Sequence, residues 1–477
     1  MDILIQCREL LIDMKQVFFG VDLGTTNTKV LSVDSDGKFI AITKESTEWL
    51  VLPNGKIEAN VDQIYKLLLD CINRLITLTK NEIGDFQVAG IGITGMAESG
   101  VILDQNRNLL TQPVAWFDSR GEKEMNDLGA DFKNEYQTKT GLVFKPESSL
   151  STLLAMKSDG FDFKQKGIVW LNLSEYVAFK FTGTLATEPS LASRTALFDQ
   201  STLKFWQRAK EILGVEESFI PEQRFAGQSW GNIVSDQLPA QLQNAVVTVG
   251  GHDHPVAAVG SGATGDDQVF NSAGTGDAIV RSVPGTLTDQ QRAALTGLGV
   301  SAGRHTLQNA TVLIGGSRGG LVLRRALDLI GARSGDALKA IDDAWDINHK
   351  FIDVIDMNQE KSVSNDIKIV LTGDAGPNDL WAAALDYMAS ENKKMLDGIA
   401  EVVGKHKYAL GSGGWLKLRS VREIKTKIMP NLEISNIDEP GAFGAAFMAS
   451  WASQQTDGSI VEHISKRVKN LNSEYRI

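Results

Sequence analysis

The sequence predicts an α/β protein built from two similar halves. A strand, a helix and a second strand follow one another between residues 17 and 95, with small residues at the strand ends, which is typical of an α/β domain with a parallel component. An apolar strand, a turn with glycine and threonine, and another apolar strand occur at 17–30 and again at 267–280, which indicates an internal repeat. At 477 residues the chain also exceeds what one hydrophobic core usually supports.

The first of these hairpins places an acid beside its turn. Residues 17–19 are apolar, Asp22 follows, and residues 24–27 read Gly-Thr-Thr-Asn before the second strand. Backbone N–H groups and hydroxyls in such a turn suit a phosphate, and Asp22 would lie close enough to hold a metal that accompanies it. The alternative is an ordinary hairpin in which glycine and threonine serve only the turn.

The rest of the first half continues the alternation of strands and helices. Spacings of three and four between apolar residues predict an amphipathic helix at 60–80, and a buried strand at 88–95 leads to Met96, Ala97 and Glu98. Ligands of such folds gather at the carboxyl ends of strands, which makes these three residues candidates. We also expect strands at 39–43 and 101–104, helices at 122–128, 148–157 and 173–181, and a polar loop at 187–195.

Near residue 245 the pattern restarts. A strand at 245–249 is followed by Gly-Gly-His-Asp-His, a small-residue helix at 256–262 and the second hairpin. We expect helices at 321–329, 381–403 and 416–429, a strand at 408–410, and a last helix from Pro440 whose glycines and alanines allow close approach to another backbone. We divide the chain into an extension at 1–16, a first domain at 17–250 and a second domain at 251–477.

Composition excludes several classes of protein. With 48 basic and 59 acidic residues the net charge is −11, which argues against a nucleic-acid partner. Cys7 and Cys71 form no C-x-x-C pattern, so neither a zinc site nor a disulfide framework is indicated, and a reducing cytoplasm is expected. Residues 1–16 lack the apolar core of a signal peptide, and no run of about 18 apolar residues predicts a membrane span.

Asp253 is the strongest candidate for chemistry. It stands at a glycine-lined strand end, where it could accept the proton of a substrate hydroxyl that attacks a γ-phosphate. A helix N-cap is the alternative, because aspartate suits that position well. His252 and His254 flank it, but a His-x-His pair alone is weak evidence for a metal.

Two further groups of residues are candidates. Gly413 and Gly414 follow a strand and precede a helix, where glycine permits close backbone approach to a ligand, although a tight turn alone would also explain them. Glu98, Trp116, Asp118 and Arg120 could bind adjacent hydroxyls of a polyol, or could simply be solvated surface residues. No G-x-x-x-x-G-K-[ST] or G-x-S-x-G motif indicates a P-loop enzyme or a hydrolase.

Together these segments resemble the FGGY family of carbohydrate kinases. The matching segments are F-G-V-D-L-G-T-T-N-T-K, G-G-H-D-H-P-V-A-A-V-G, N-S-A-G-T-G-D, G-S-G-G-W and E-P-G-A-F-G-A-A-F-M-A, in the order and spacing of the family from about Val17 to Trp451. The resemblance implies two actin-like domains with RNase H-like cores and an active-site cleft between them. Sugar or polyol would bind mostly on the first domain, and ATP with Mg²⁺ mostly on the second.

The resemblance also assigns roles by matched position. Asp253 corresponds to the catalytic base and Asp22 to the acid near Mg²⁺, with Asp253 also on the metal side. The positions that match nucleotide contacts are Thr25, Thr26, Asn27, Gly274, Thr275, Gly413 and Gly414. On the substrate side, Glu98 matches an acid that contacts substrate in some members, and His254 stands where others have Gln or Asn. Trp116, Asp118 and Arg120 complete the predicted substrate side.

This chain departs from the family at several positions. Ala97 stands where glycerol kinases have arginine, which puts glycerol in doubt as the substrate, and the Gln-Met-His of xylulose kinases is absent. Trp415 and the two residues after it replace the usual small polar residues of the last glycine motif, which puts the adenine contacts in doubt.

Three functions remain to be compared. The leading hypothesis is an ATP-dependent kinase that phosphorylates a hydroxyl of a small sugar, ketose or polyol. The alternative is a nucleotide-switched binding protein similar to actin or to the chaperone ATPases. Those proteins share the duplicated hairpin but need no acid at position 253. They also carry a peptide-binding or polymerising extension, and the sequence after Trp451 is too short to supply one. A sugar-binding regulator without turnover is the third. The sequence leaves the substrate and the oligomeric state, a homodimer included, open.

Overall fold

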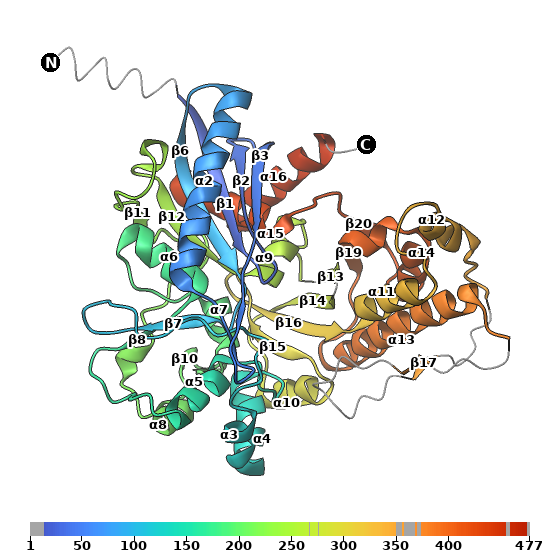
Figure 1. The fold of residues 1–477 in the computed structure, drawn as a ribbon, viewed down its shortest axis with the longest axis horizontal. Coiled ribbons are helices and arrows are strands. Elements are labelled where there is room, and N and C mark those ends of the chain that lie inside the picture. Colours follow the sequence, from blue (N-terminus) through green and yellow to red (C-terminus); the bar gives the residue numbers. More distant parts are fainter. Residues whose placement is uncertain are drawn as a thin grey trace.

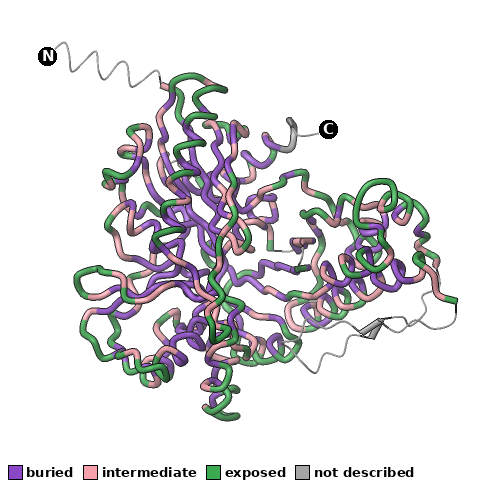
Figure 2. The backbone as a smooth tube through the Cα atoms, in the orientation of Figure 1, coloured by how far each residue is buried: buried purple, intermediate pink, exposed green. Residues whose placement is uncertain are grey.

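The computed structural model describes residues 14–266, 268–274, 276–349, 355–356, 368–369, 374–454 and 458–474. Within these ranges the chain forms two six-stranded sheets, each with helices packed against it (Figure 1). Buried residues concentrate in the strands and in the helix faces against them (Figure 2).

The first sheet is organised around the first hairpin. Strand β1 pairs antiparallel with β2 and parallel with β6, and β12 continues the sheet parallel to β6. The strand order is β11-β12-β6-β1-β2-β3. The strands are β1 (Lys15–Leu23), β2 (Asn27–Asp34), β3 (Phe39–Ser46), β6 (Phe86–Gly95), β11 (Gly231–Asn232) and β12 (Val246–His252).

The second sheet repeats this arrangement. Strand β13 pairs antiparallel with β14 and parallel with β19, as β1 does with β2 and β6. Its order is β15-β16-β14-β13-β19-β20, so the predicted internal repeat is confirmed. The strands are β13 (Gln268–Ala273), β14 (Asp277–Pro284), β15 (Ser301–Arg304), β16 (Ala310–Ser317), β19 (Tyr408–Ser412) and β20 (Leu432–Ile434).

Helices cover both faces of the first sheet, because successive residues of β1 are apolar on both sides. Val17, Phe19 and Val21 pack toward α2 (Val61–Ile83) and α6 (Leu173–Thr182). Phe18 packs on the other face against α9 (Asp253–Gly260), α15 (Pro440–Gln454) and α16 (Ile460–Glu474). Two C-terminal helices therefore close the core of the first sheet.

The backbone of helix α15 packs directly against the backbone of the first sheet. A Cβ added at Gly20 would lie 1.9 Å from the carbonyl oxygen of Ala442, and one at Gly92 would lie 1.9 Å from that of Ala445. Such contacts are closer than any side chain allows, so β1 and β6 require glycine where α15 crosses them. The expectation that the last helix approaches another backbone closely is confirmed.

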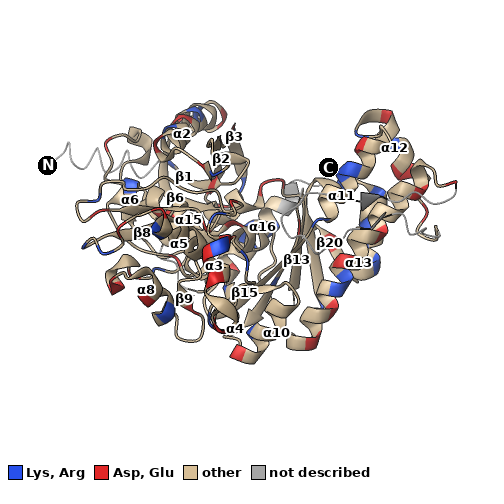
Figure 3. Cartoon of the chain, turned by 60° about the horizontal axis from the view of Figure 1, so that its bottom comes forward, with Lys and Arg blue, Asp and Glu red and all other residues tan. Residues whose placement is uncertain are grey.

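The remaining helices and strands lie around the two sheets, with charges of both signs interspersed on their surfaces (Figure 3). None of the helices in the described ranges is long and apolar enough to cross a membrane. The remaining helices are α3 (Glu122–Asp127), α4 (Gly129–Thr140), α5 (Ser149–Ser158), α7 (Pro189–Arg194), α8 (Gln207–Leu213), α10 (Asp289–Gly297), α11 (Gly319–Leu329), α12 (Gly335–Ala344), α13 (Pro377–Val403), α14 (Arg419–Ile428), η1 (Glu217–Phe219), η2 (Ala240–Leu242) and η3 (Gly414–Lys417). The small strand pairs are β4 (Leu50–Val51) with β5 (Ile57–Glu58), β7 (Gly100–Leu103) with β8 (Val169–Asn172), β9 (Phe198–Asp199) with β10 (Lys204–Phe205), and β17 (Ile355–Asp356) with β18 (Lys368–Ile369).

The structure corrects four expectations about single elements. The predicted loop at 187–195 contains helix α7, which Glu188 caps with its carboxylate and Pro189 opens. The helix predicted at 256–262 begins at Asp253, directly after β12, and the one predicted at 416–429 divides into η3 and α14. Strand β1 begins at Lys15, inside the predicted extension, and residues 1–13 of that extension lie outside the described residues.

Candidate active site

Four segments that are far apart in the sequence line one cavity of about 230 Å³. Asp22 comes from the first hairpin, Asp253 and His254 from the start of α9, Gly274 from the second hairpin, and Gly413 from the turn after β19. They meet because β1, β12, β13 and β19 all end at this place, as the carboxyl ends of strands in α/β folds commonly do. The structure therefore brings these predicted residues together.

Asp22 is a buried carboxylate with one free oxygen. The side chain lies at the end of β1, and Lys29 approaches Oδ2 at 3.5 Å while pairing more closely with Glu439, at 2.6 Å. Its Oδ1 has no hydrogen-bond partner among the described residues. Burial raises the pKa of Asp22 to about 6, against the lowering effect of Lys29. A buried carboxylate oxygen facing a cavity that Asp253 also lines is a donor set that fits Mg²⁺.

Asp253 is held between two imidazoles. His254 Nδ1 lies 2.9 Å and His252 Nε2 lies 3.2 Å from its Oδ1, and the two rings stack with their centroids 5.3 Å apart. Burial acts to raise the pKa of Asp253, but the two histidines outweigh burial and hold that pKa well below its usual range. The carboxylate is therefore ionised at neutral pH, and neither imidazole contact occupies Oδ2.

The turn of the first hairpin is fixed by two tryptophans. The indole N–H of Trp116 donates to the hydroxyl of Thr25 at 2.7 Å, and that of Trp49 donates to the Thr25 carbonyl at 2.8 Å. Thr26 is exposed, and the carbonyl of Asn27 accepts the N–H of Gly24 at 3.1 Å across the turn. Sequence reasoning missed Trp49, whose position 24 residues beyond Thr25 gives no local signal.

Glu98 lies at the edge of the site in a strained backbone conformation. Its φ is +66°, which is unusual for a residue with a side chain, and the hydroxyl of Ser149 donates to its carbonyl at 2.9 Å. Its carboxylate accepts from Arg194 Nε of helix α7 at 2.6 Å. Ala97 is buried in the core of the first sheet. Arg194 was not predicted, although it is the last residue but one of the polar stretch at 187–195.

Asp118 and Arg120 form a buried ion pair. Arg120 Nε and Nη2 donate to the two oxygens of Asp118 at 3.0 and 2.9 Å, and Nη1 donates to Glu58 at 2.6 Å. The Asp118 carboxylate also accepts the N–H of Ile57 at 2.5 Å. Both side chains are almost fully buried, so a substrate would reach them only by replacing these bonds.

The glycine turn after β19 borders a second, larger cavity. Gly413 has φ +123°, and a Cβ there would lie 2.3 Å from the carbonyl of Ala273. Gly414 opens η3, and both glycines line a cavity of about 820 Å³ that shares Ser412, Gly413, Asp438 and Glu439 with the first one. Thr275, predicted beside Gly274, lies outside the described residues.

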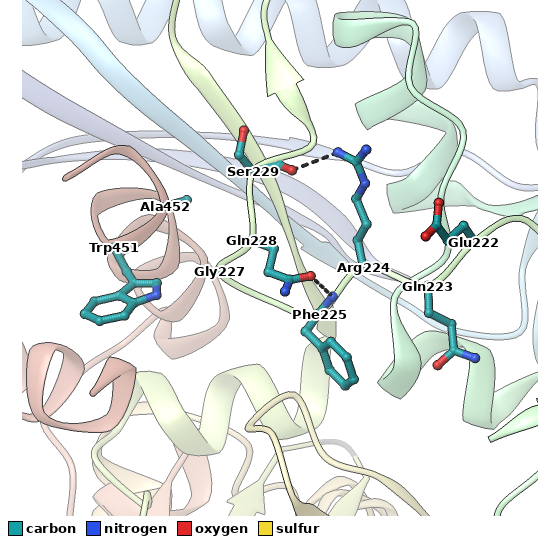
Figure 4. A pocket seen from close by; sticks show the side chains of 9 residues that line it. All are labelled: Glu222, Gln223, Arg224, Phe225, Gly227, Gln228, Ser229, Trp451 and Ala452. Carbon is teal, nitrogen blue, oxygen red and sulfur yellow. Dashed lines mark hydrogen bonds between the residues drawn. The ribbon is translucent and has the colours of Figure 1, made fainter. Parts of the chain in front are cut away.

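A separate groove of about 610 Å³ lies between residues 222–229 and the end of α15 (Figure 4). Arg224 donates there to the carbonyl of Ser229 at 2.9 Å, and Trp451 forms the opposite wall. None of the predicted site residues lines it.

Comparison with known proteins gives the following matches. The model of the N-terminal domain of the FGGY family of carbohydrate kinases matches residues 17–260. Glycerol kinase from Listeria monocytogenes serotype 4b (strain F2365) is 26% identical over 292 residues, covering 57% of this chain and 58% of the relative. Glycerol kinase from Thermococcus gammatolerans is 25% identical over 279 residues, covering 57% and 53%. These matches span little more than half the length of the curated relatives.

Solved structures match over nearly the whole chain. Ligand-bound xylulose kinase from Lactobacillus acidophilus superposes with a TM-score of 0.80 at 20% identity, covering 94% of this chain and 91% of that one. Plasmodium falciparum glycerol kinase with ADP gives 0.82 at 19% identity, covering 97% and 93%. These similarities establish the two-domain, actin-like α/β fold, as expected from the sequence.

Proposed function

This chain belongs to the FGGY family of carbohydrate kinases, and on that premise we propose that it transfers the γ-phosphate of ATP to a hydroxyl of a small sugar, ketose or polyol. The observation that carries the proposal is the cavity that both hairpins, the glycine turn and Asp253 line together. A phosphate bound between two such hairpins would lie beside an ionised carboxylate. We further propose that residues 17–250 and 251–477 correspond to the sugar-side and nucleotide-side domains.

Asp253 acts as the general base in this proposal. Its ionised carboxylate accepts the proton of the substrate hydroxyl as the hydroxyl oxygen attacks the γ-phosphate, and His252 and His254 keep it oriented. Asp22 and Asp253 would hold Mg²⁺, which when bound supplies charge neutralisation on the transferred phosphoryl group. Lys29, paired with Glu439, fixes the side of the cavity where Asp22 lies.

The nucleotide is proposed to lie along the two connected cavities. The turn at residues 24–27 and the turn at 274–276 would surround the β- and γ-phosphates with backbone N–H groups. Gly413 and Gly414 allow the adenosine to approach the chain in the larger cavity. Closure of the two domains would exclude water, which would otherwise hydrolyse ATP at the same site.

The acceptor is proposed to be uncharged. The proposed substrate side includes the carboxylates of Glu98 and Asp253, and Arg194 Nε already donates to Glu98 at 2.6 Å. An anionic sugar acid would meet two carboxylates beside an arginine that already has a carboxylate partner. This favours polyols and ketoses, for which the similar glycerol and xylulose kinases are named, over a sugar acid, for which the similar gluconate kinase from Lactobacillus acidophilus is named.

A coupled assay of ADP release tests the proposal. We expect one or more polyols or ketoses of three to six carbons to stimulate turnover, and Asp253→Asn to lower kcat by about 100-fold or more while KM for ATP stays within about 3-fold. An unchanged stimulated rate in Asp253→Asn would rule out this base. ATP hydrolysis that no acceptor stimulates, together with nucleotide-dependent assembly, would instead favour the actin-like or chaperone-like alternative.

A further inference from the structure

Helix α7 connects the two sides of the candidate site. At its C-terminal end Arg194 pairs with Glu98, and near its N-terminal end Ser190 contacts the strand that leads to Asp253. The helix has only six residues, and none of them is among the residues assigned above to the base, the metal or the nucleotide. The contact made by Ser190 therefore needs its own explanation.

Ser190 holds the backbone directly before the proposed base. Its hydroxyl oxygen accepts the N–H of His252 at 2.9 Å, while the hydroxyl of Thr94 donates to the carbonyl of Gly251 at 2.6 Å from the neighbouring strand. Gly251 has φ +108°, and a Cβ there would lie 2.3 Å from Ser190 Oγ. The end of β12 is thus fixed between β6 and α7, and the direction in which Asp253 leaves the strand is set at this point.

Glu188 in turn fixes the Ser190 hydroxyl. Its Oε2 accepts that hydroxyl at 2.5 Å and the N–H groups of Ser190 and Leu191 at 2.8 and 3.0 Å. Because the hydroxyl proton is committed to Glu188, the oxygen lone pairs of Ser190 are left for the N–H of His252. Glu188 is 0% exposed, and its Oε1 has no hydrogen-bond partner among the described residues.

A second buried acid supports the first. Glu175 Oε1 accepts the N–H of Glu188 and the hydroxyl of Thr187, both at 2.8 Å, and its Oε2 accepts the N–H of Asn172 at 2.8 Å. Capping a helix of six residues requires only one small polar side chain. Glu175 also closes the capping box of α6 with Asn172. The fully buried carboxyl group of Glu188, however, costs stability beyond what capping α7 requires, so its placement points to a role in the geometry of the strand end.

We propose that Glu188, acting through Ser190, is a positioning residue for Asp253. Neither residue lines the two cavities of the candidate site. They keep the N–H of His252 bonded, so that the carboxylate one residue later meets the acceptor hydroxyl. The inference rests on the proposed function, in which Asp253 is the base. Without the Glu188–Ser190 contact the strand end relaxes, and a displacement of about 1 Å at a reacting group costs on the order of 100-fold in rate.

The test combines steady-state kinetics with hydrogen exchange of the His252 amide. In Ser190→Ala and Glu188→Ala we expect kcat to fall by about 10- to 100-fold with both KM values within about 2-fold, and the His252 amide to exchange about 10-fold faster or more. Glu188→Gln keeps an acceptor oxygen in place and should restore kcat to within about 3-fold of the wild type. Thr248→Val is the control, because it removes another buried hydroxyl of β12, one that accepts the N–H of Gly227 at 3.1 Å.

Each outcome decides the question. Unchanged exchange of His252 in Ser190→Ala, or faster exchange with an unchanged kcat, would overturn the positioning role. A loss of kcat in Thr248→Val equal to that in Ser190→Ala would overturn it as well, since the effect would then be general destabilisation of the strand. A wild-type protein that phosphorylates no acceptor refutes the proposed function instead, and the exchange of His252 in Ser190→Ala still decides whether Ser190 holds the strand end.

Discussion

Replacing Lys425 with methionine should destabilise the half of the molecule that carries the second hairpin. Lys425 of α14 is 0% exposed, and its ammonium donates to both oxygens of Asp277 at 2.9 and 2.8 Å. Asp277 is the first residue of β14, so this ion pair ties the end of the β13–β14 turn to the helix layer. Methionine keeps much of the length of lysine and removes only the charge and its hydrogen bonds.

The expected loss follows from what remains around Asp277. Removing one partner of a buried ion pair typically costs about 3–5 kcal/mol, because the other charge is left uncompensated. The side-chain amides of Asn271 and Asn392 still donate to Asp277, at 2.8 and 2.5 Å, so the loss should lie near the lower end, at about 3 kcal/mol. Adding Asp277→Asn to Lys425→Met removes the uncompensated charge and should recover about 2 kcal/mol of the lost stability.

Urea unfolding of the wild type, the two single variants and the double variant measures this cycle. Because a two-domain chain can unfold in more than one step, the cycle is measured on the transition of the affected half, for which Trp381 of α13 is a buried fluorescence reporter. Because the turn carries Gly274, KM for ATP should rise in Lys425→Met. A Lys425→Met protein within about 1 kcal/mol of the wild type, or a double variant less stable than Lys425→Met, would refute the reasoning.

Three further predictions follow from buried groups in the first half. Burial raises the pKa of Glu188 from 4.5 to about 8. The native state therefore binds this proton more tightly than the unfolded state does. The stability that the bound proton contributes is complete below about pH 4.5 and is lost as the pH rises toward 8. Between pH 5 and 8 the wild type should lose about 3 kcal/mol relative to Glu188→Gln in urea unfolding, and parallel curves would contradict this assignment. Gly92→Ala should lower the free energy of unfolding by about 3 kcal/mol or more, because the new Cβ would lie 1.9 Å from a backbone carbonyl of α15. The control is Gly316→Ala on strand β16, where a Cβ would have nothing within 4 Å, and its stability should stay within about 1 kcal/mol of the wild type. Glu98→Gln should leave Arg194 without its carboxylate and raise kcat/KM for sugar acids relative to polyols by about 10-fold or more; an unchanged ratio in the same coupled assay would show that this pair does not select against anionic acceptors.

Local patterns in the sequence were sufficient to predict the frame of the site. Both hairpins consist of apolar runs around short glycine-containing turns, and such signals lie within a few residues of one another. Asp22, Asp253 and Gly413 each follow an apolar strand, and strands of this kind deliver their ends to one edge of a sheet. Their meeting in one cavity therefore follows from the order of elements, without knowledge of any side-chain contact.

The partners of these residues could not be predicted in the same way. Trp49, Glu439 and Arg194 reach the site across large separations in sequence, and only the folded packing decides which polar groups they meet. Asp118 and Arg120 were predicted to bind a polyol because their residue types suit hydroxyl groups, but in the structure they hydrogen-bond to each other. Helix α7 was missed because six residues give no apolar period, although a capping glutamate before a proline at the first helical position was a usable signal.

Two buried polar networks flank the cavity, and neither is needed merely to fill space. The Glu188–Ser190 contact fixes the strand before Asp253, and the Lys425–Asp277 pair fixes the turn after Gly274. Well-packed apolar residues can match or exceed a buried ion pair in stability, so stability alone does not account for charges at these places. If the networks instead set geometry, Lys425→Met combined with Asp277→Asn, which keeps an acceptor oxygen for Asn392, should fold with a stability within about 1 kcal/mol of the wild type and still show a raised KM for ATP. A double variant with both normal stability and normal KM would show that the second hairpin keeps its shape without the pair.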